Sequence, residues 1–166
     1  MKTSRIIIGL AVALFLTSAC AMPAHAIGIF GQWQDSKDAD SGYGLGIKQG
    51  YSIIPLVMIE GRVSWLNYSI ADTDSDMNVY PLEVFAALKF GMFYGGLGIG
   101  YYIMSGDYTP DDAVGGFASL GLDFSLAGLG LFGEVRYLLL ESEVEATGGT
   151  GDMTGVGANL GVTLPF

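Results

Sequence analysis

Residues 159–166, with the sequence NLGVTLPF, decide the fold of this chain. Apolar side chains alternate here with small or polar ones: Leu160, Val162, Leu164 and Phe166 against Asn159, Gly161 and Thr163. Period-two alternation places the two sets on opposite faces of a β-strand. Similar alternation recurs along the chain between turns, and its apolar face suits contact with lipid. The pattern predicts an all-β membrane protein.

The start of the chain has the features of a cleaved signal peptide. Two basic residues precede an apolar run at 6–19, which is short for a membrane-spanning helix. The tripeptide Ala-His-Ala at 24–26 then provides a cleavage motif. The alternative is a lipoprotein acylated on Cys20, although threonine stands three positions earlier, where bacterial lipoprotein signals usually carry leucine. We expect residues 1–26 to be removed and residues 27–166 to form one domain.

Eight strands are expected after the signal peptide. They lie near 28–34, 42–51, 56–69, 78–90, 92–104, 113–125, 129–141 and 153–166. Long polar loops alternate with short turns along the chain: 35–41, 70–77, 105–112 and 142–152 against 52–55, 90–91 and 126–128. Short turns are typically periplasmic in outer-membrane barrels. We therefore predict an eight-stranded antiparallel up-and-down transmembrane β-barrel with both termini in the periplasm.

Charged residues separate into two groups, and the first lies on the face opposite the apolar one. Four bases and four acids share this face: Lys48, Arg62, Lys89 and Arg136 with Glu60, Glu83, Asp123 and Glu134. Charge inside a low-dielectric barrel is costly unless it is paired. We therefore predict a lumenal charge network in which these eight side chains meet.

The second group is acidic and falls in or beside the four long loops. Its thirteen members are Asp35, Asp38, Asp40, Asp72, Asp74, Asp76, Asp107, Asp111, Asp112, Glu141, Glu143, Glu145 and Asp152. With Lys37 as the loop base, this rim carries −12, which is the whole net charge of residues 27–166. Such a rim argues against nucleic-acid binding, because phosphates attract basic surfaces. It either keeps the loops hydrated or attracts divalent cations that bridge to the phosphates of lipopolysaccharide.

One loop has spacing that resembles a calcium site. The pattern Asp72-x-Asp74-x-Asp76 matches the start of an EF-hand loop, but Met77 stands where that loop needs glycine. An EF-hand is therefore rejected, and a weak, nonspecific cation site is the alternative. We expect no dedicated metal site and no cofactor.

Aromatic residues gather near both ends of the expected strands. Trp33, Tyr43, Trp65, Tyr80 and Tyr101 lie toward the long loops, whereas Tyr51, Phe90, Phe93, Phe124 and Phe166 lie toward the short turns. Two aromatic girdles around an apolar band are typical of membrane barrels. A soluble barrel of the lipocalin kind would instead keep its apolar side chains inside and its polar ones outside.

These features resemble the small eight-stranded outer-membrane barrels of Gram-negative bacteria, of the OmpA, OmpX and opacity-protein type. The most specific match is the C-terminal assembly signal of that class, polar-x-Gly-x-x-hydrophobic-x-aromatic. Its positions are filled by Asn159, Gly161, Leu164 and Phe166, with Pro165 as a departure. The resemblance implies recognition by the barrel-assembly machinery and residence among outer-membrane lipids and lipopolysaccharide. A monomer is expected, because a closed barrel has no free edge strand.

Three kinds of function fit such a barrel. Some outer-membrane barrels are enzymes that modify lipid A with a catalytic histidine, but residues 27–166 contain neither His nor Cys. A narrow channel or a path for small hydrophobic solutes is the alternative, because glycines line part of the expected interior. We favour a non-catalytic barrel that presents four acidic extracellular loops in a structural, surface-interaction or adhesive role.

Overall fold

The computed structural model describes residues 26–37, 41–69, 76–106, 111–126, 128–144 and 149–165. These ranges form eight long strands and one short hairpin. The long strands are β1 (Ala26–Ser36), β2 (Gly42–Ile54), β3 (Val57–Ser69), β4 (Asp76–Phe90), β5 (Phe93–Gly106), β6 (Ala113–Leu126), β7 (Leu129–Leu139) and β10 (Gly155–Pro165). The hairpin is β8 (Glu141–Val144) with β9 (Gly149–Asp152). Residues 1–25 of the predicted signal peptide and Phe166 lie outside the described residues.

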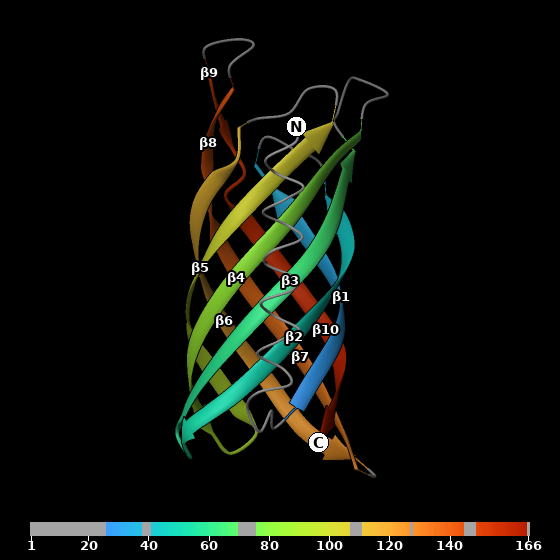
Figure 1. The fold of residues 1–166 in the computed structure, drawn as a ribbon, viewed down its shortest axis with the longest axis vertical. Helices are drawn as coiled ribbons and strands as arrows, with labels where there is room; N and C mark the ends of the chain where they lie inside the picture. The colour runs from blue at the N-terminus through green and yellow to red at the C-terminus, as the bar shows by residue number, and fades with distance from the viewer. Residues whose placement is uncertain are drawn as a thin grey trace.

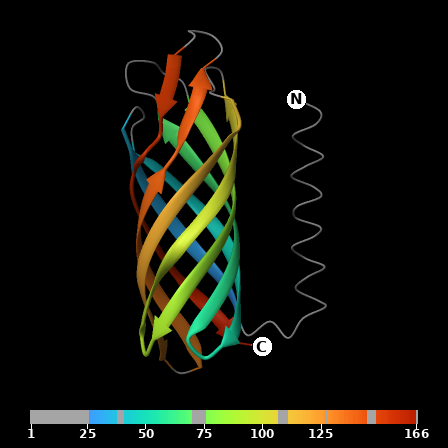
Figure 2. The ribbon, with the colours of Figure 1, turned by 90° about the vertical axis from the view of Figure 1, so that its left-hand side faces the viewer.

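The long strands close into one antiparallel barrel, in the order β1-β10-β7-β6-β5-β4-β3-β2 (Figures 1 and 2). Ala26 pairs with Pro165 on one side and with Gly50 on the other, so β1 closes the barrel between β10 and β2. Both ends of the barrel domain therefore lie at the end that carries the short turns. Gly91 and Gly128 occupy two of these turns with φ angles of 63° and 85°, in the left-handed region that favours glycine.

The fourth predicted loop was wrong in one respect, because it contains the β8–β9 hairpin. The hairpin continues the pairing of β7 with β10 in the same register, because Leu138 pairs with Gly155 and Glu141 pairs with Asp152. Between the two paired segments, the Met153 backbone N–H donates to the Leu140 carbonyl at 2.9 Å. The hairpin therefore projects past the rim at the loop end (Figure 1). Among the described residues, no helix is long and apolar enough to cross a membrane.

The outer face of the barrel is an apolar band. Leu97, Leu120 and Leu160 are 71%, 73% and 72% exposed, which is the reverse of a soluble β-core. Exposed aromatic side chains flank the band: Tyr43 and Trp65 toward the loops, and Tyr51, Phe90, Phe93 and Phe124 toward the short turns. The predicted girdle members Trp33, Tyr80 and Tyr101 are only half-exposed. This surface fits lipid and excludes the lipocalin-like arrangement.

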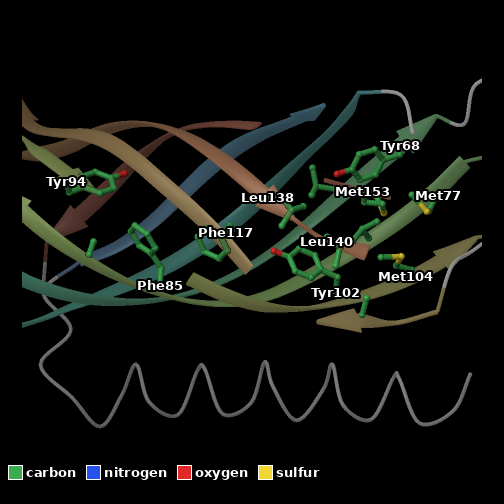
Figure 3. Packing of buried hydrophobic residues seen from close by; sticks show 14 residues of the cluster. Tyr68, Met77, Phe85, Tyr94, Tyr102, Met104, Phe117, Leu138, Leu140 and Met153 are labelled. Atoms are coloured by element: carbon green, nitrogen blue, oxygen red, sulfur yellow. The ribbon is translucent and has the colours of Figure 1, made fainter. Parts of the chain in front are cut away.

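Apolar side chains fill the loop-side half of the interior. Figure 3 shows Tyr68, Tyr102, Leu138 and Leu140 pointing inward, with Met77, Met104 and Met153 nearer the loop end. All seven belong to one buried cluster, which continues to Phe85, Tyr94 and Phe117. Methionine suits an irregular space of this kind, because its unbranched side chain adapts to its neighbours.

Several inward glycines make room for aromatic rings. A β-carbon on Gly46 would lie 2.3 Å from the Phe30 ring, and one on Gly98 would lie 2.2 Å from the Phe117 ring. Gly121 faces the Tyr94 ring in the same way. Gly28 instead makes room for a long charged side chain, that of Lys48. The glycines therefore do not leave an open pore at these positions.

Candidate functional site

The eight side chains of the lumenal charge network all point into the barrel. Six of them are buried: Lys48, Glu60, Arg62, Glu83, Glu134 and Arg136. Lys89 and Asp123 lie near the short turns and are about one third exposed. Every one of the eight pairs with another member of the set, so the structure contains the balance of charge that burial requires.

Arg62 is the centre of the larger part of the network. Its Nε donates to Glu60 Oε1 at 2.5 Å, and its Nη1 and Nη2 donate to the two oxygens of Glu134 at 2.6 and 2.7 Å. Lys48 Nζ lies 3.1 Å from the second oxygen of Glu60. Glu134 also accepts hydrogen bonds from the Tyr94 hydroxyl at 3.0 Å and from Asn159 Nδ2 at 2.9 Å. A bidentate pair with this many further bonds is geometrically fixed.

A second, smaller part joins Arg136 to Glu83. Nη1 and Nη2 of Arg136 donate to the two carboxylate oxygens of Glu83 at 3.0 and 2.5 Å. The Tyr102 hydroxyl donates to Glu83 Oε1 at 2.8 Å. This pair lies one step nearer the loops than the Arg62 cluster, against the apolar packing described above.

Aromatic rings cover the cations. The alternation of residues in the sequence does not reveal these contacts. Lys48 Nζ lies 3.4 Å from the centre of the Phe132 ring. The guanidinium carbons of Arg62 and Arg136 lie 4.5 Å from the Phe85 ring and 4.3 Å from the Phe117 ring, respectively. Such contacts favour a cation that has lost its water. These ion pairs and rings together occlude the middle of the barrel, and we call them the plug.

A cavity of about 200 Å³ lies between this plug and the short turns. We call it the vestibule. Its polar lining includes Lys48, Glu60, Lys89 and Asp123, with Lys89 Nζ 2.6 Å from Asp123 Oδ2. Tyr94 forms part of its wall. The vestibule is balanced in charge, and the Arg62 cluster separates it from the loop-side half of the lumen.

Known proteins resemble this chain in structure only. No protein-family model and no curated protein matches the sequence. The crystal structure of Neisserial surface protein A is 16% identical with a TM-score of 0.59, and the match covers 85% of this chain and 95% of that one. The solid-state NMR structure of the outer-membrane protein AlkL in lipid bilayers is 13% identical with a TM-score of 0.54, covering 87% and 90%.

The chain has the fold of a small outer-membrane β-barrel. The predicted all-β, eight-stranded antiparallel architecture is confirmed. Both matches span almost the full length of this barrel, and both are surface or outer-membrane proteins by name. The apolar band around the outside of the barrel supports a location in a membrane on physical grounds. The predicted location in an outer membrane therefore agrees with the fold.

The four residues of the predicted assembly signal have different surroundings in the barrel. Asn159 points inward and bonds Glu134, and Gly161 lies against the Phe30 and Phe132 side chains. Leu164 points outward into the apolar band. Phe166 lies outside the described residues. Three of the positions thus have structural contacts within the barrel, and their recognition by the assembly machinery remains a prediction.

The loop end of the barrel is acidic where it is described. Asp35 Oδ1 accepts a hydrogen bond from Ser41 at 3.1 Å, and Asp112 accepts bonds from Tyr101 and from the Met104 backbone. The candidate cation ligands Asp72 and Asp74 lie outside the described residues. Within the described ranges, no three or more His, Cys, Asp or Glu side chains form a group that could hold a metal ion.

Lys37 ties the β8–β9 hairpin to β1. Its Nζ lies 2.7 Å from Asp152 Oδ2, and the Thr154 backbone N–H donates to Asp152 Oδ1 at 2.9 Å. The hydrogen bond from Lys37 is the largest cause that lowers the pKa of Asp152, from 3.8 to about 2, and the bonds from Thr154 lower it further. Because the folded pKa is below the ordinary value, this contact stabilises the hairpin above pH 3.8 and is lost as the pH falls through 2.

Replacing Lys37 by methionine is expected to raise the pKa of Asp152 part of the way toward 3.8, because the bonds from Thr154 remain. A pH titration of the Asp152 carboxyl carbon by NMR measures this. Ser41→Ala is the matched control, since it removes a bond to Asp35 and none to Asp152. An unchanged pKa in Lys37→Met would show that the ion pair does not hold the hairpin in solution.

Proposed function

We propose that this protein is a non-catalytic outer-membrane barrel that presents four acidic loops at the cell surface, in a structural or surface-interaction role. The observation that carries the proposal is the sorting of charge. The lumen holds four bases and four acids in closed pairs, whereas the net charge of −12 resides in the loops. The paired charges inside the lumen stabilise the barrel, whereas the net negative charge of the loops can attract a partner.

The side chains that the chain offers support a non-catalytic role. Residues 27–166 contain no histidine, and the inward serines would need another base. Lys48 and Lys89 are the nearest substitutes, but each is held in an ion pair with a carboxylate. Ser119 is buried and donates to the Val135 carbonyl at 3.4 Å. None of these groups is arranged as a nucleophile with its base.

The partner that suits the acidic loops is the phosphate-rich surface of lipopolysaccharide, bridged by divalent cations. Carboxylate oxygens and phosphates repel one another directly, but both are good ligands for Ca²⁺ and Mg²⁺. The aromatic girdle at the loop end supports this partner, because such girdles lie at the level of the lipid headgroups. In this view the loops help to tie the barrel to the outer leaflet and present a polyanionic surface to other cells.

Calcium should therefore stabilise the barrel in vesicles that contain lipopolysaccharide, and much less in phosphatidylcholine vesicles. The measurement is the unfolding temperature, followed by the gel shift of heated samples, with and without millimolar calcium. Changing Asp72, Asp74 and Asp76 to asparagine should reduce the difference. Thr73→Asn with Ser75→Asn is the matched control, because it alters the same loop without changing its charge. Equal calcium effects in both lipids would refute the proposed partner.

A narrow channel is the second candidate, and the vestibule is the observation that favours it. The plug around Arg62 argues against it, since it fills the lumen beyond the vestibule with paired charges and rings. We expect the refolded barrel (residues 27–166) to give no steady conductance steps in a planar bilayer, with folding confirmed by the gel shift. Resolvable steps would favour transport over the surface role.

A further inference from the structure

The end of the barrel that carries the short turns stays apolar beyond its aromatic girdle. The three turns, at 51–56, 90–93 and 126–129, contain no charged side chain. Five apolar side chains in these turns are at least 50% exposed, and we call them the turn rim: Ile53, Ile54, Leu56, Met92 and Leu126. The rim continues the outer apolar band to the end of the barrel opposite the β8–β9 hairpin (Figure 2). Exposed apolar surface marks a binding partner, and continuity with the lipid-facing band indicates lipid.

Two backbone hydrogen bonds join the turn rim to the mouth of the vestibule. The Lys89 N–H donates to the Leu56 carbonyl at 2.9 Å, and the Asp123 N–H donates to the Met92 carbonyl at 2.7 Å. The side chains of Lys89 and Asp123 form an ion pair that is about one third exposed and lines the vestibule. A charged pair thus lies directly beside exposed apolar side chains. A surface with these two parts suits an amphiphile.

The vestibule is balanced in charge, but its charged groups have more hydrogen-bond donors to offer than acceptors. Both oxygens of Glu60 are engaged, one by Arg62 Nε and the other by Lys48 Nζ. An ammonium group carries three N–H donors, and Lys89 uses one of them on Asp123 Oδ2. Lys48 likewise has one carboxylate partner within the described residues. The spare donors of the two lysines therefore outnumber the one remaining carboxylate oxygen, Asp123 Oδ1, which favours an anion as ligand.

We propose that the turn end binds a phospholipid, with the phosphate in the vestibule beside Lys89 and the acyl chains on the turn rim. Lys48 lies deeper in the same cavity and offers a second cation. The cavity of about 200 Å³ is smaller than the pockets of about 300–1,000 Å³ that hold drug-sized ligands, so it suits a headgroup and not a whole lipid. With the turns in the periplasm, as predicted, the lipid comes from the inner leaflet. The site is independent of the proposed role of the acidic loops, which lie at the other end.

NMR of lysine side chains tests this in the refolded barrel (residues 27–166), because that chain has only three lysines. The lysines are labelled with ¹³C at Cε, and the barrel is kept in dodecyl maltoside micelles, which contain no phosphate. Dihexanoylphosphatidylglycerol is the probe, and inorganic phosphate is titrated in parallel. We expect saturable shifts at Lys89 and Lys48 and none at Lys37, which is paired with Asp152 at the loop end. The lipid should reach half-saturation at a concentration about tenfold or more below that of phosphate, because only the lipid covers the turn rim.

Two results of these titrations would overturn the proposal. One is the lack of a saturable shift at Lys89 and Lys48, or an equal shift at Lys37. The other is half-saturation at the same concentration of lipid and of inorganic phosphate, which would assign the vestibule to free phosphate and leave the turn rim without a role.

Leu56→Ser separates binding at the rim from general uptake of lipid by the micelle. It should raise the half-saturating lipid concentration roughly threefold or more and leave that of inorganic phosphate unchanged, because Leu56 is exposed and adjoins Lys89 only through its carbonyl. Val114→Ser is the matched control, since Val114 is 63% exposed near the loop end of β6 and should not affect either titration. Equal effects of the two substitutions on lipid binding would refute a site at the turn rim. The gel shift of heated samples confirms that each variant is folded.

Discussion

Arg62→Ala is expected to lower the free energy of unfolding by about 3–5 kcal/mol, the range found when one partner of a buried ion pair is removed. Arg62 supplies both bonds to the Glu134 carboxylate and a third to Glu60. Without it Glu134 keeps the bonds from Tyr94 and Asn159 but loses the one cation that bonds it directly. Urea unfolding of the purified barrel in micelles, followed by tryptophan fluorescence, measures the change.

Two comparisons make the Arg62 result specific. Arg62→Ala combined with Glu134→Gln should recover part of the loss, because the uncompensated charge is then removed as well. Lys37→Ala breaks an exposed pair at the loop end and should change the free energy far less. Equal stability of Arg62→Ala and the unaltered protein would contradict the view that the network holds the barrel together.

Phe85→Ala is the second change with a large expected effect, about 3–5 kcal/mol. Phe85 is fully buried, stacks on Phe117 with ring centres 5.7 Å apart, and meets Tyr94 edge-on at 6.4 Å. Its ring also covers the guanidinium of Arg62 at 4.5 Å. Removing it leaves a cavity in the closed lumen and uncovers the central cation, so two stabilising contacts are lost together.

The same unfolding experiment measures the effect of Phe85→Ala. Phe93→Ala is the matched control, because Phe93 is 60% exposed on the outer face, where lipid or detergent can fill the space left by the ring. The control should lose clearly less stability. A larger loss for Phe93 than for Phe85 would mean that the outer girdle, and not the occluded lumen, dominates the stability of the barrel.

Much of the architecture could be predicted because a strand has a period of two. Placing Arg62 on the inner face of β3 also fixes Glu60 and Ser64 on that face, and the structure places all three inside. The same parity identifies inward aromatic residues such as Phe85 and Phe117. Their inward position could therefore be predicted from the sequence, but their contact with the cations could not.

The partners could not be predicted, because period two fixes the face and not the register. Arg62 and Glu134 are 72 residues apart in the chain and meet across the lumen, on strands that are not neighbours. Such a contact depends on the tilt of the strands and on the closure of the barrel. Asn159 was assigned only to the assembly signal for the same reason. Nothing near it in the sequence points to Glu134.

The hairpin β8–β9 is a place where the local sequence predicts the wrong structure. Residues 142–152 are polar and rich in glycine, which is typical of a loop. The chain nevertheless pairs there because β8 and β9 continue the register of β7 and β10, and that register is set by the closed barrel. Local sequence carries little information of that kind.

The pairing of β1 with β10 has a consequence for the order of events during synthesis. The strand made first after the expected signal peptide finds one of its two neighbours only when the strand made last has emerged. Until then the growing sheet has two open edges, which would attract other chains. The barrel can therefore close only after β10 has been made, and β1 lacks one of its two neighbours until then.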